Sequence, residues 1–154
     1  ALGRLAPNYY LVDGTVPRTK LVEVLSRINQ MSRDTGYPIA NLLHAGDGNL
    51  HPSVLFDERK PGDTKNALEI GGQILALCVD VGGVLSGEHG IGLEKQQYMP
   101  LMFSHADMKA MSMLKPAFAT SDLFNPGKVF PTGASCVEIY QHSAVVKAGP
   151  DAFI

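Results

Sequence analysis

The chain has 154 residues, of which 45% are hydrophobic and 18% are charged, and its formal net charge at pH 7 is −2. A single domain of this length buries a sizeable core, and the sequence holds no Lys/Arg run that would favour nucleic acid or an anionic membrane as a partner. It also holds no apolar run near the roughly 18–20 residues of a transmembrane helix, no signal-peptide pattern and no cysteine framework, so a reducing cytoplasm is the expected setting.

The first half of the chain alternates strand and helix signals. Aromatic and β-branched residues predict a strand over 9–16, and apolar side chains at helical spacing predict an amphipathic helix over 18–35 that Gly36 ends. A strand over 39–43 then leads into a hairpin, whose second arm leaves through 54–56.

Helices dominate the second half. An apolar stripe predicts a helix over 63–81, in which Cys78 is buried, and a further helix fits 105–119, with a short strand at 84–85 between them. The order strand, helix, strand, strand, helix favours an α+β fold, in which helices pack on one face of an antiparallel sheet.

Two histidines, His44 and His51, flank an Asp-Gly pair, which is the strongest short-range signal for a hairpin with a type I′ turn. With Asp47 and Gly48 as the loop, His44 would pair with His51, and directly opposed residues have Cβ atoms about 4.5–5.5 Å apart on one face. That spacing suits two imidazoles that share a metal ion, whereas the alternative is a pair of histidines that only form hydrogen bonds on the sheet surface. Pro52 predicts a local irregularity in the second arm or a place near a sheet edge.

A glycine-rich segment at 82–92 places a carboxylate and an imidazole next to each other, as Glu88 and His89. Adjacent residues on extended backbone point to opposite sides, so the two can serve different partners. Glu88 then completes a metal site with His44 and His51, and His89 stays available as an acid–base group. The alternative is an exposed loop whose Glu and His are solvated.

The remaining polar candidates have simpler explanations. Asp47 is expected to serve the turn, because Asp tolerates left-handed backbone and bonds locally. Asn49 is similar, although its amide could bond a cofactor. His105 and His142 are expected to be ordinary surface residues.

Four motifs occur in an order that marks a known family: YLVDGTVPR at 10–18, HAGDGNLHP at 44–52, SGEHGIG at 86–92 with Lys95, and LFNPGKVFP at 123–131. Together they resemble the C-terminal part of FAD-linked oxidases of the vanillyl-alcohol-oxidase type, in the branch that oxidises 2-hydroxy acids. The resemblance implies that 1–131 is the C-terminal part of the cap, or substrate, domain, a ferredoxin-like fragment, and that 132–154 is a peripheral tail. It also implies that the FAD domain is absent from this chain, which by itself should then be inactive.

The resemblance further implies roles for single residues. His44, His51 and Glu88 would bind a divalent cation, with Zn²⁺ as the expected metal. His89 would remove the hydroxyl proton of a 2-hydroxy acid while C2 of the substrate passes a hydride to the flavin.

The motif at 123–131 implies that Asn125 and Lys128 approach the FAD or its phosphates, although a helix-terminal turn explains Asn-Pro-Gly equally well. Relatives that act on dicarboxylates place a basic residue near Leu11, so this leucine favours a monocarboxylic substrate of the glycolate or lactate kind. Other oxidase subunits are implied partners. Two alternatives stay open: a metal-dependent hydrolase that uses the same His-His-Glu set around an activated water, and a non-catalytic ferredoxin-like binding module.

Overall fold

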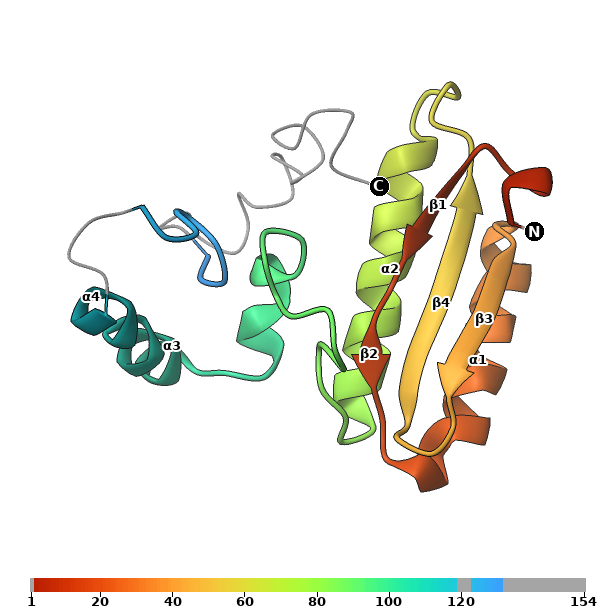
Figure 1. Ribbon diagram of the computed structural model, residues 1–154. Helices are drawn as coiled ribbons and strands as arrows, with labels where there is room; N and C mark the ends of the chain where they lie inside the picture. The colour runs from red at the N-terminus through yellow and green to blue at the C-terminus, as the bar shows by residue number, and fades with distance from the viewer. Residues whose placement is uncertain (1, 119–122, 132–154) are drawn as a thin grey trace. The chain divides into compact units, whose positions relative to one another are not determined.

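A computed structural model describes residues 2–118 and 123–131, and it divides the chain into two units, Ala1–Gly90 and Ile91–Ile154. The first unit carries an antiparallel sheet and two long helices (Figure 1). The predicted tail at 132–154, with His142, and the last residue of the predicted helix 105–119 lie outside the described residues.

Strand β4 (Asn49–Phe56) is the centre of the sheet. Strands β1 (Asn8–Leu11) and β2 (Gly14–Thr15) follow one another along one of its edges, and β3 (Ile39–His44) pairs with the other. The predicted strand over 9–16 is therefore present as two short strands, and the predicted strand at 84–85 is reduced to a single bridge between Val84 and Thr15.

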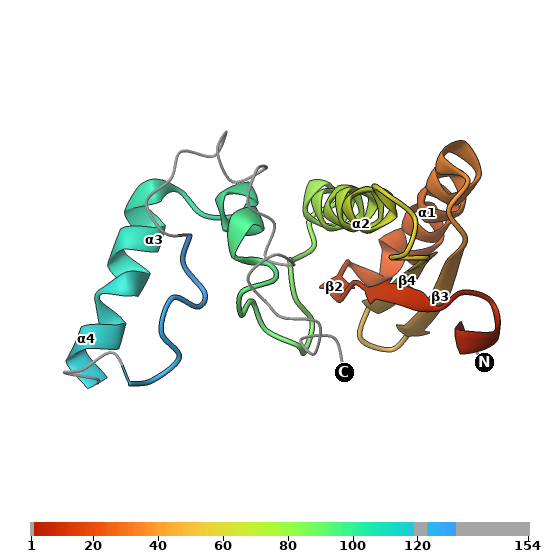
Figure 2. The same ribbon diagram turned by 90° about the horizontal axis from the view of Figure 1, so that it is seen from above.

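Helices α1 (Leu21–Thr35) and α2 (Asp63–Asp80) cover the same face of this sheet, as Figure 2 shows from above. The predicted apolar stripes are the reason, because Leu21, Val24 and Ile28 of α1 are buried, as is the stripe of α2 from Ala67 to Cys78. The α+β fold with helices on one face is thus confirmed. The ferredoxin-like assignment stays a prediction.

Two glycines fix how this layer is built. Gly36 ends α1 with a φ of 75°, a left-handed cap that glycine adopts without a steric penalty. Gly71 of α2 lies against Tyr10 of β1, where an added Cβ would overlap the ring and come within 3.2 Å of Val12. Tyr10 and Val12 therefore point toward the helices, and the residues that alternate with them point to the opposite, open face of the sheet.

The hairpin register differs from the predicted one. His44 pairs with Asn49 and Leu42 pairs with His51, so the loop has four residues, 45–48, rather than two. A type I′ turn would need a positive φ at Asp47 as well as at Gly48, and only Gly48 has one, at 78°. The His44 carbonyl accepts from the N–H groups of Asp47 and Gly48 instead, so Asp47 serves the turn without left-handed backbone.

Pro52 lies in the central strand, so the prediction of a place near an edge is wrong. The second arm itself is the unbroken strand β4, and the interruption lies instead on the neighbouring edge, between β1 and β2. The register of β1 and β2 with β4 continues across the gap between them, which places Val12 opposite Pro52 and Asp13 opposite His51. Because Pro52 has no N–H, it cannot donate to this neighbour, although its carbonyl still accepts from Val12.

The second unit contains short helices: a 3₁₀ helix (Gln96–Leu101), α3 (His105–Ser112) and α4 (Leu114–Phe118). The predicted single helix 105–119 is wrong, because the chain turns at Met113. Pro116 accounts for this break, since it lacks the N–H that would bond Ser112 and its ring clashes with that carbonyl. Two more 3₁₀ turns, Leu2–Arg4 and Arg18–Lys20, belong to the first unit. No helix in the described part of the chain has the length and apolar character needed to cross a membrane.

Candidate metal and catalytic site

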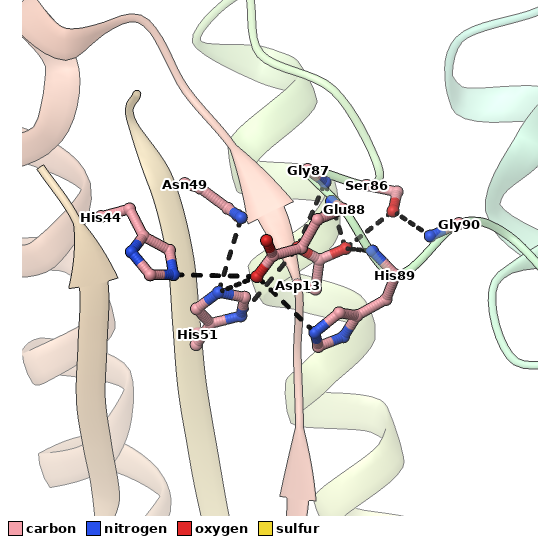
Figure 3. A network of polar contacts seen from close by, with 9 residues as sticks. All are labelled: Asp13, His44, Asn49, His51, Ser86, Gly87, Glu88, His89 and Gly90. Atoms are coloured by element: carbon pink, nitrogen blue, oxygen red, sulfur yellow. Dashed lines mark hydrogen bonds and ion pairs between the residues drawn. The ribbon is translucent and has the colours of Figure 1, made fainter. Parts of the chain in front are cut away.

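One carboxylate oxygen of Glu88 lies among three imidazole nitrogens on the open face of the sheet (Figure 3). Glu88 Oε1 is 2.9 Å from Nε2 of His51, 3.7 Å from Nε2 of His44 and 3.9 Å from Nε2 of His89. The structure therefore brings together the four residues predicted for the metal and for the acid–base step.

The two hairpin histidines meet although the predicted register is wrong. His44 pairs with Asn49, and His51 lies two residues further along β4, so both side chains are diagonal neighbours on one face. Their ring centroids are 5.2 Å apart and nearly perpendicular. His51 is buried, with 5% of its side chain exposed, whereas 54% of the His44 side chain is exposed.

Glu88 and His89 come from the segment that follows α2, and glycine lets that segment approach the sheet. An added Cβ at Gly87 would overlap the side chain of Asn49, so a larger residue would push this backbone away from β4. The His89 ring stacks on His51, with centroids 5.1 Å apart and an interplanar angle of 22°. Glu88 and His89 are adjacent in sequence, and both side chains contact His51.

Asp13 is part of the cluster, and the sequence analysis did not single it out. Its side chain is fully buried, and it accepts hydrogen bonds from the hydroxyl of Ser86 and from the N–H groups of Gly87, Glu88 and His89. A signal was available, because a carboxylate inside a strand of aromatic and β-branched residues is a charge placed in an apolar setting.

The donor set fits a divalent cation such as Zn²⁺. Two ligands held at about 2.0–2.1 Å by one tetrahedral zinc ion lie roughly 3.3 Å apart, and the three distances around Glu88 Oε1 bracket this value. Ligand atoms of Asp13, His51, Glu88 and His89 also lie within 4.8 Å of one another. Both oxygens of Asp13 already accept hydrogen bonds, which favours a supporting position for Asp13. His44 is not one of these four residues, and its Nε2 lies 3.7 Å from Glu88 Oε1.

Four buried polar side-chain atoms of the first unit have no hydrogen-bond partner among the described residues, and two of them border this cluster: Nδ1 of His51 and Oδ1 of Asn49. Buried polar groups are nearly always paired, and a bound ion or ligand is one explanation for an exception. The Asn49 amide nitrogen is 3.5 Å from His51 Nε2, so the amide side chain borders the same cluster.

The residues predicted to approach the flavin lie in the second unit. Asn125 and Lys128 line a groove with Lys115 and with apolar and aromatic side chains, among them Phe118 and Phe124. The Lys115 ammonium donates to the Asn125 carbonyl at 3.1 Å, and the positive φ of Asn125, 46°, fits the turn that the sequence also allowed. His105, at the start of α3, is exposed as predicted.

The chain can be assigned to a known protein family. Residues 1–129 match the family described as FAD linked oxidases, C-terminal domain, and the chain belongs to this family. The description of this family names oxidases, whereas the sequence had also left open a hydrolase and a binding module.

Three individual relatives align with most of this chain. The chain is 48% identical over 138 residues to the glycolate oxidase subunit GlcD of Escherichia coli (strain K12), which covers 90% of this chain and 28% of the relative. It is 35% identical over 134 residues to the protein of the same name in Bacillus subtilis, covering 87% of this chain and 28% of that protein. It is 36% identical over 119 residues to a D-lactate dehydrogenase of Archaeoglobus fulgidus, covering 77% of this chain and 26% of that protein. The chain thus spans little more than a quarter of the length of these relatives.

Proposed function

We propose that this chain is the C-terminal part of a flavin-dependent 2-hydroxy-acid oxidoreductase of the glycolate or D-lactate type, and that it supplies the substrate site. The observation that carries the proposal is the position of Glu88 Oε1, within 2.9–3.9 Å of Nε2 of three histidines. The names of the relatives, a glycolate oxidase subunit and a D-lactate dehydrogenase, support the substrate class.

In this proposal His44, His51 and Glu88 hold a divalent cation, and His89 is the catalytic base. A bound cation would supply Lewis acidity toward the carboxylate and hydroxyl oxygens of the substrate, and FAD would supply the acceptor for the hydride from C2. His89 stacks on His51 and keeps 44% of its side chain exposed, so its ring can face a substrate and remove the hydroxyl proton.

Leu11 supports a monocarboxylic substrate. It pairs with Ser53, two residues along β4 from His51, so its side chain lies on the same open face as the imidazole cluster. An aliphatic side chain has no charge with which to hold a second carboxylate. Small acids such as glycolate or lactate therefore suit this face better than a dicarboxylate.

The groove of the second unit supports a flavin-facing role for Asn125 and Lys128. Its aromatic and aliphatic wall suits a ring system, and the ammonium groups of Lys115 and Lys128 suit phosphate. Because two relatives are described as oxidase subunits, we include partner subunits in the proposal, together with the cytoplasmic setting expected from the cysteine content.

In the complete flavoprotein that carries these residues, variants of the metal ligands and of the base should differ in their metal content and in their turnover. His51→Ala or His44→Ala should lose bound metal and turnover together. His89→Gln should keep the metal and lower turnover by about 10²–10⁴-fold, the usual contribution of a general base.

Elemental analysis and steady-state rates with glycolate and D-lactate measure both properties, with His105→Ala as the control for loss of an exposed imidazole that belongs to the second unit. Normal turnover with full metal content in His51→Ala would remove the metal site from the proposal. Loss of metal in His89→Gln would make His89 a ligand instead of the base.

A further inference from the structure

Asp13 connects the two halves of the site, and this connection comes from the fold. It lies between β1 and β2, directly opposite His51 in the register of β4, and none of its surface is exposed. The segment 86–89, which carries Glu88 and His89, lies over it. One carboxylate therefore faces the hairpin half of the site on one side and accepts hydrogen bonds from the glycine-rich half on the other (Figure 3).

Toward the glycine-rich segment, Asp13 accepts from four donors. The Ser86 hydroxyl donates to Oδ2 at 2.7 Å, and the N–H groups of Gly87, Glu88 and His89 donate to the two oxygens at 3.1–3.3 Å. Successive N–H groups that converge on one anion fix the backbone that carries them, because charge-assisted hydrogen bonds are about twice as strong as neutral ones. The Glu88 and His89 side chains leave the backbone from this fixed segment.

Toward the hairpin, Asp13 faces the ring nitrogen of His51 that points away from Glu88. Nδ1 of His51 is 3.9 Å from Oδ1 of Asp13, and this buried nitrogen has no hydrogen-bond partner among the described residues. A histidine that ligates a metal through one nitrogen nearly always donates its other N–H to a carboxylate, a carbonyl or water, which fixes the tautomer. Asp13 is the carboxylate in that position for His51.

We propose that Asp13 is the positioning residue of this site: it holds the backbone of 86–89, and it sets the orientation of His51 so that Nε2 faces Glu88. It does not touch substrate. The proposal rests on the metal-binding part of the proposed function, but its effect on the backbone of 86–89 exists without any metal.

The test compares Asp13→Asn with the wild type in the complete flavoprotein. The amide keeps the size of the carboxylate but loses its charge, and its NH₂ group cannot accept a hydrogen bond. We expect a 10–100-fold weaker affinity for Zn²⁺ at unchanged stoichiometry, the usual cost of losing such a partner, measured by competition with a chelator. We also expect amide hydrogen exchange at 87–89 to become about 10–100-fold faster in the metal-free protein.

Two further variants make the result specific. Asp80→Asn, at the exposed end of α2, is the matched control and should change neither quantity. Ser86→Ala removes one donor to Asp13 and should move both quantities in the same direction by less, which keeps the test open if Asp13→Asn does not fold.

The outcomes separate this inference from the proposed function. Wild-type protein that binds no Zn²⁺ would contradict the proposed function, whereas the exchange rates would still report on Asp13. Unchanged affinity and exchange in Asp13→Asn and in Ser86→Ala would overturn the positioning role. Complete loss of Zn²⁺ stoichiometry in a folded Asp13→Asn would make Asp13 a ligand, which also overturns it.

Discussion

At the scale of single residues, the surroundings of the three imidazoles assign them different tasks. His51 is almost fully buried between β3 and the Asp13 side chain, so its ring loses little freedom when it binds. His44 and His89 keep about half of their side chains exposed and face the open side of the sheet. In the proposed metal site, His51 is therefore the ligand with the most fixed position.

Leu11 is the residue that should decide between one and two carboxylates on the substrate. Leu11→Arg places a guanidinium on the face that carries His51, and a charge-assisted hydrogen bond to a second carboxylate should raise the preference for a 2-hydroxy dicarboxylate about tenfold or more. The ratio of kcat/KM for the dicarboxylate to kcat/KM for glycolate measures this change in the complete flavoprotein.

Val22→Arg is the control, because Val22 is exposed on α1, on the opposite side of the sheet. If the ratio for Leu11→Arg stays at that of the wild type, Leu11 has no part in choosing the substrate.

At the scale of elements, the contact between α2 and β1 keeps the site in register. Gly71 allows the helix to touch Tyr10, and the same helix ends at Asp80, only a few residues before the segment that carries Glu88. A shift of α2 along the sheet would therefore move Glu88 and His89 relative to the hairpin histidines.

Gly71→Ala should destabilise the protein, because the new methyl group overlaps the Tyr10 ring and close-packed interiors tolerate added volume poorly. We expect a loss of about 1–3 kcal/mol in the free energy of unfolding, measured by chemical denaturation. Gly46→Ala is the control, since nothing lies within 4 Å of its added Cβ. Equal denaturation midpoints for the two variants would show that the sheet and helix move apart at no cost.

At the scale of the whole molecule, family membership and chain length both bear on where the flavin is bound. The family is that of FAD linked oxidases, and the chain spans 28% of the length of its glycolate oxidase relatives. We propose that the groups that bind most of the flavin belong to the rest of such a protein.

The 154-residue chain by itself should then show no oxidation of glycolate or D-lactate with an artificial electron acceptor, and should purify without flavin absorbance. The same assay on the polypeptide that includes a flavin-binding region should give turnover, because hydride transfer needs the cofactor. Oxidation by the 154-residue chain alone, at a rate above that of a His51→Ala control, would refute the proposal that the rest of the protein binds most of the flavin.

Local signals in the sequence were sufficient for the two long helices of the first unit. Helix α1, its glycine cap and α2 follow from apolar spacing and from the one residue that adopts a left-handed cap without strain. The turn placed His44 beside His51, and the glycine-rich segment placed Glu88 beside His89. That these two pairs meet was predicted from the ligand chemistry of a metal site and from the family resemblance, not from local signals. The break in the predicted helix 105–119 could also have been predicted from Pro116, but the helical spacing of the apolar residues favoured one continuous helix.

The tertiary structure decided which residues of different strands and segments lie opposite one another. The hairpin register depends on which loop residue takes a positive φ, and Gly48 does so while its backbone packs against that of Val16, the residue after β2. The role of Asp13 depends on a segment more than 70 positions later in the chain, which supplies the donors that make a buried carboxylate tolerable. Hydrophobic period and turn chemistry act over a few residues, whereas pairing between distant strands and the burial of a charge exist only once the chain has folded.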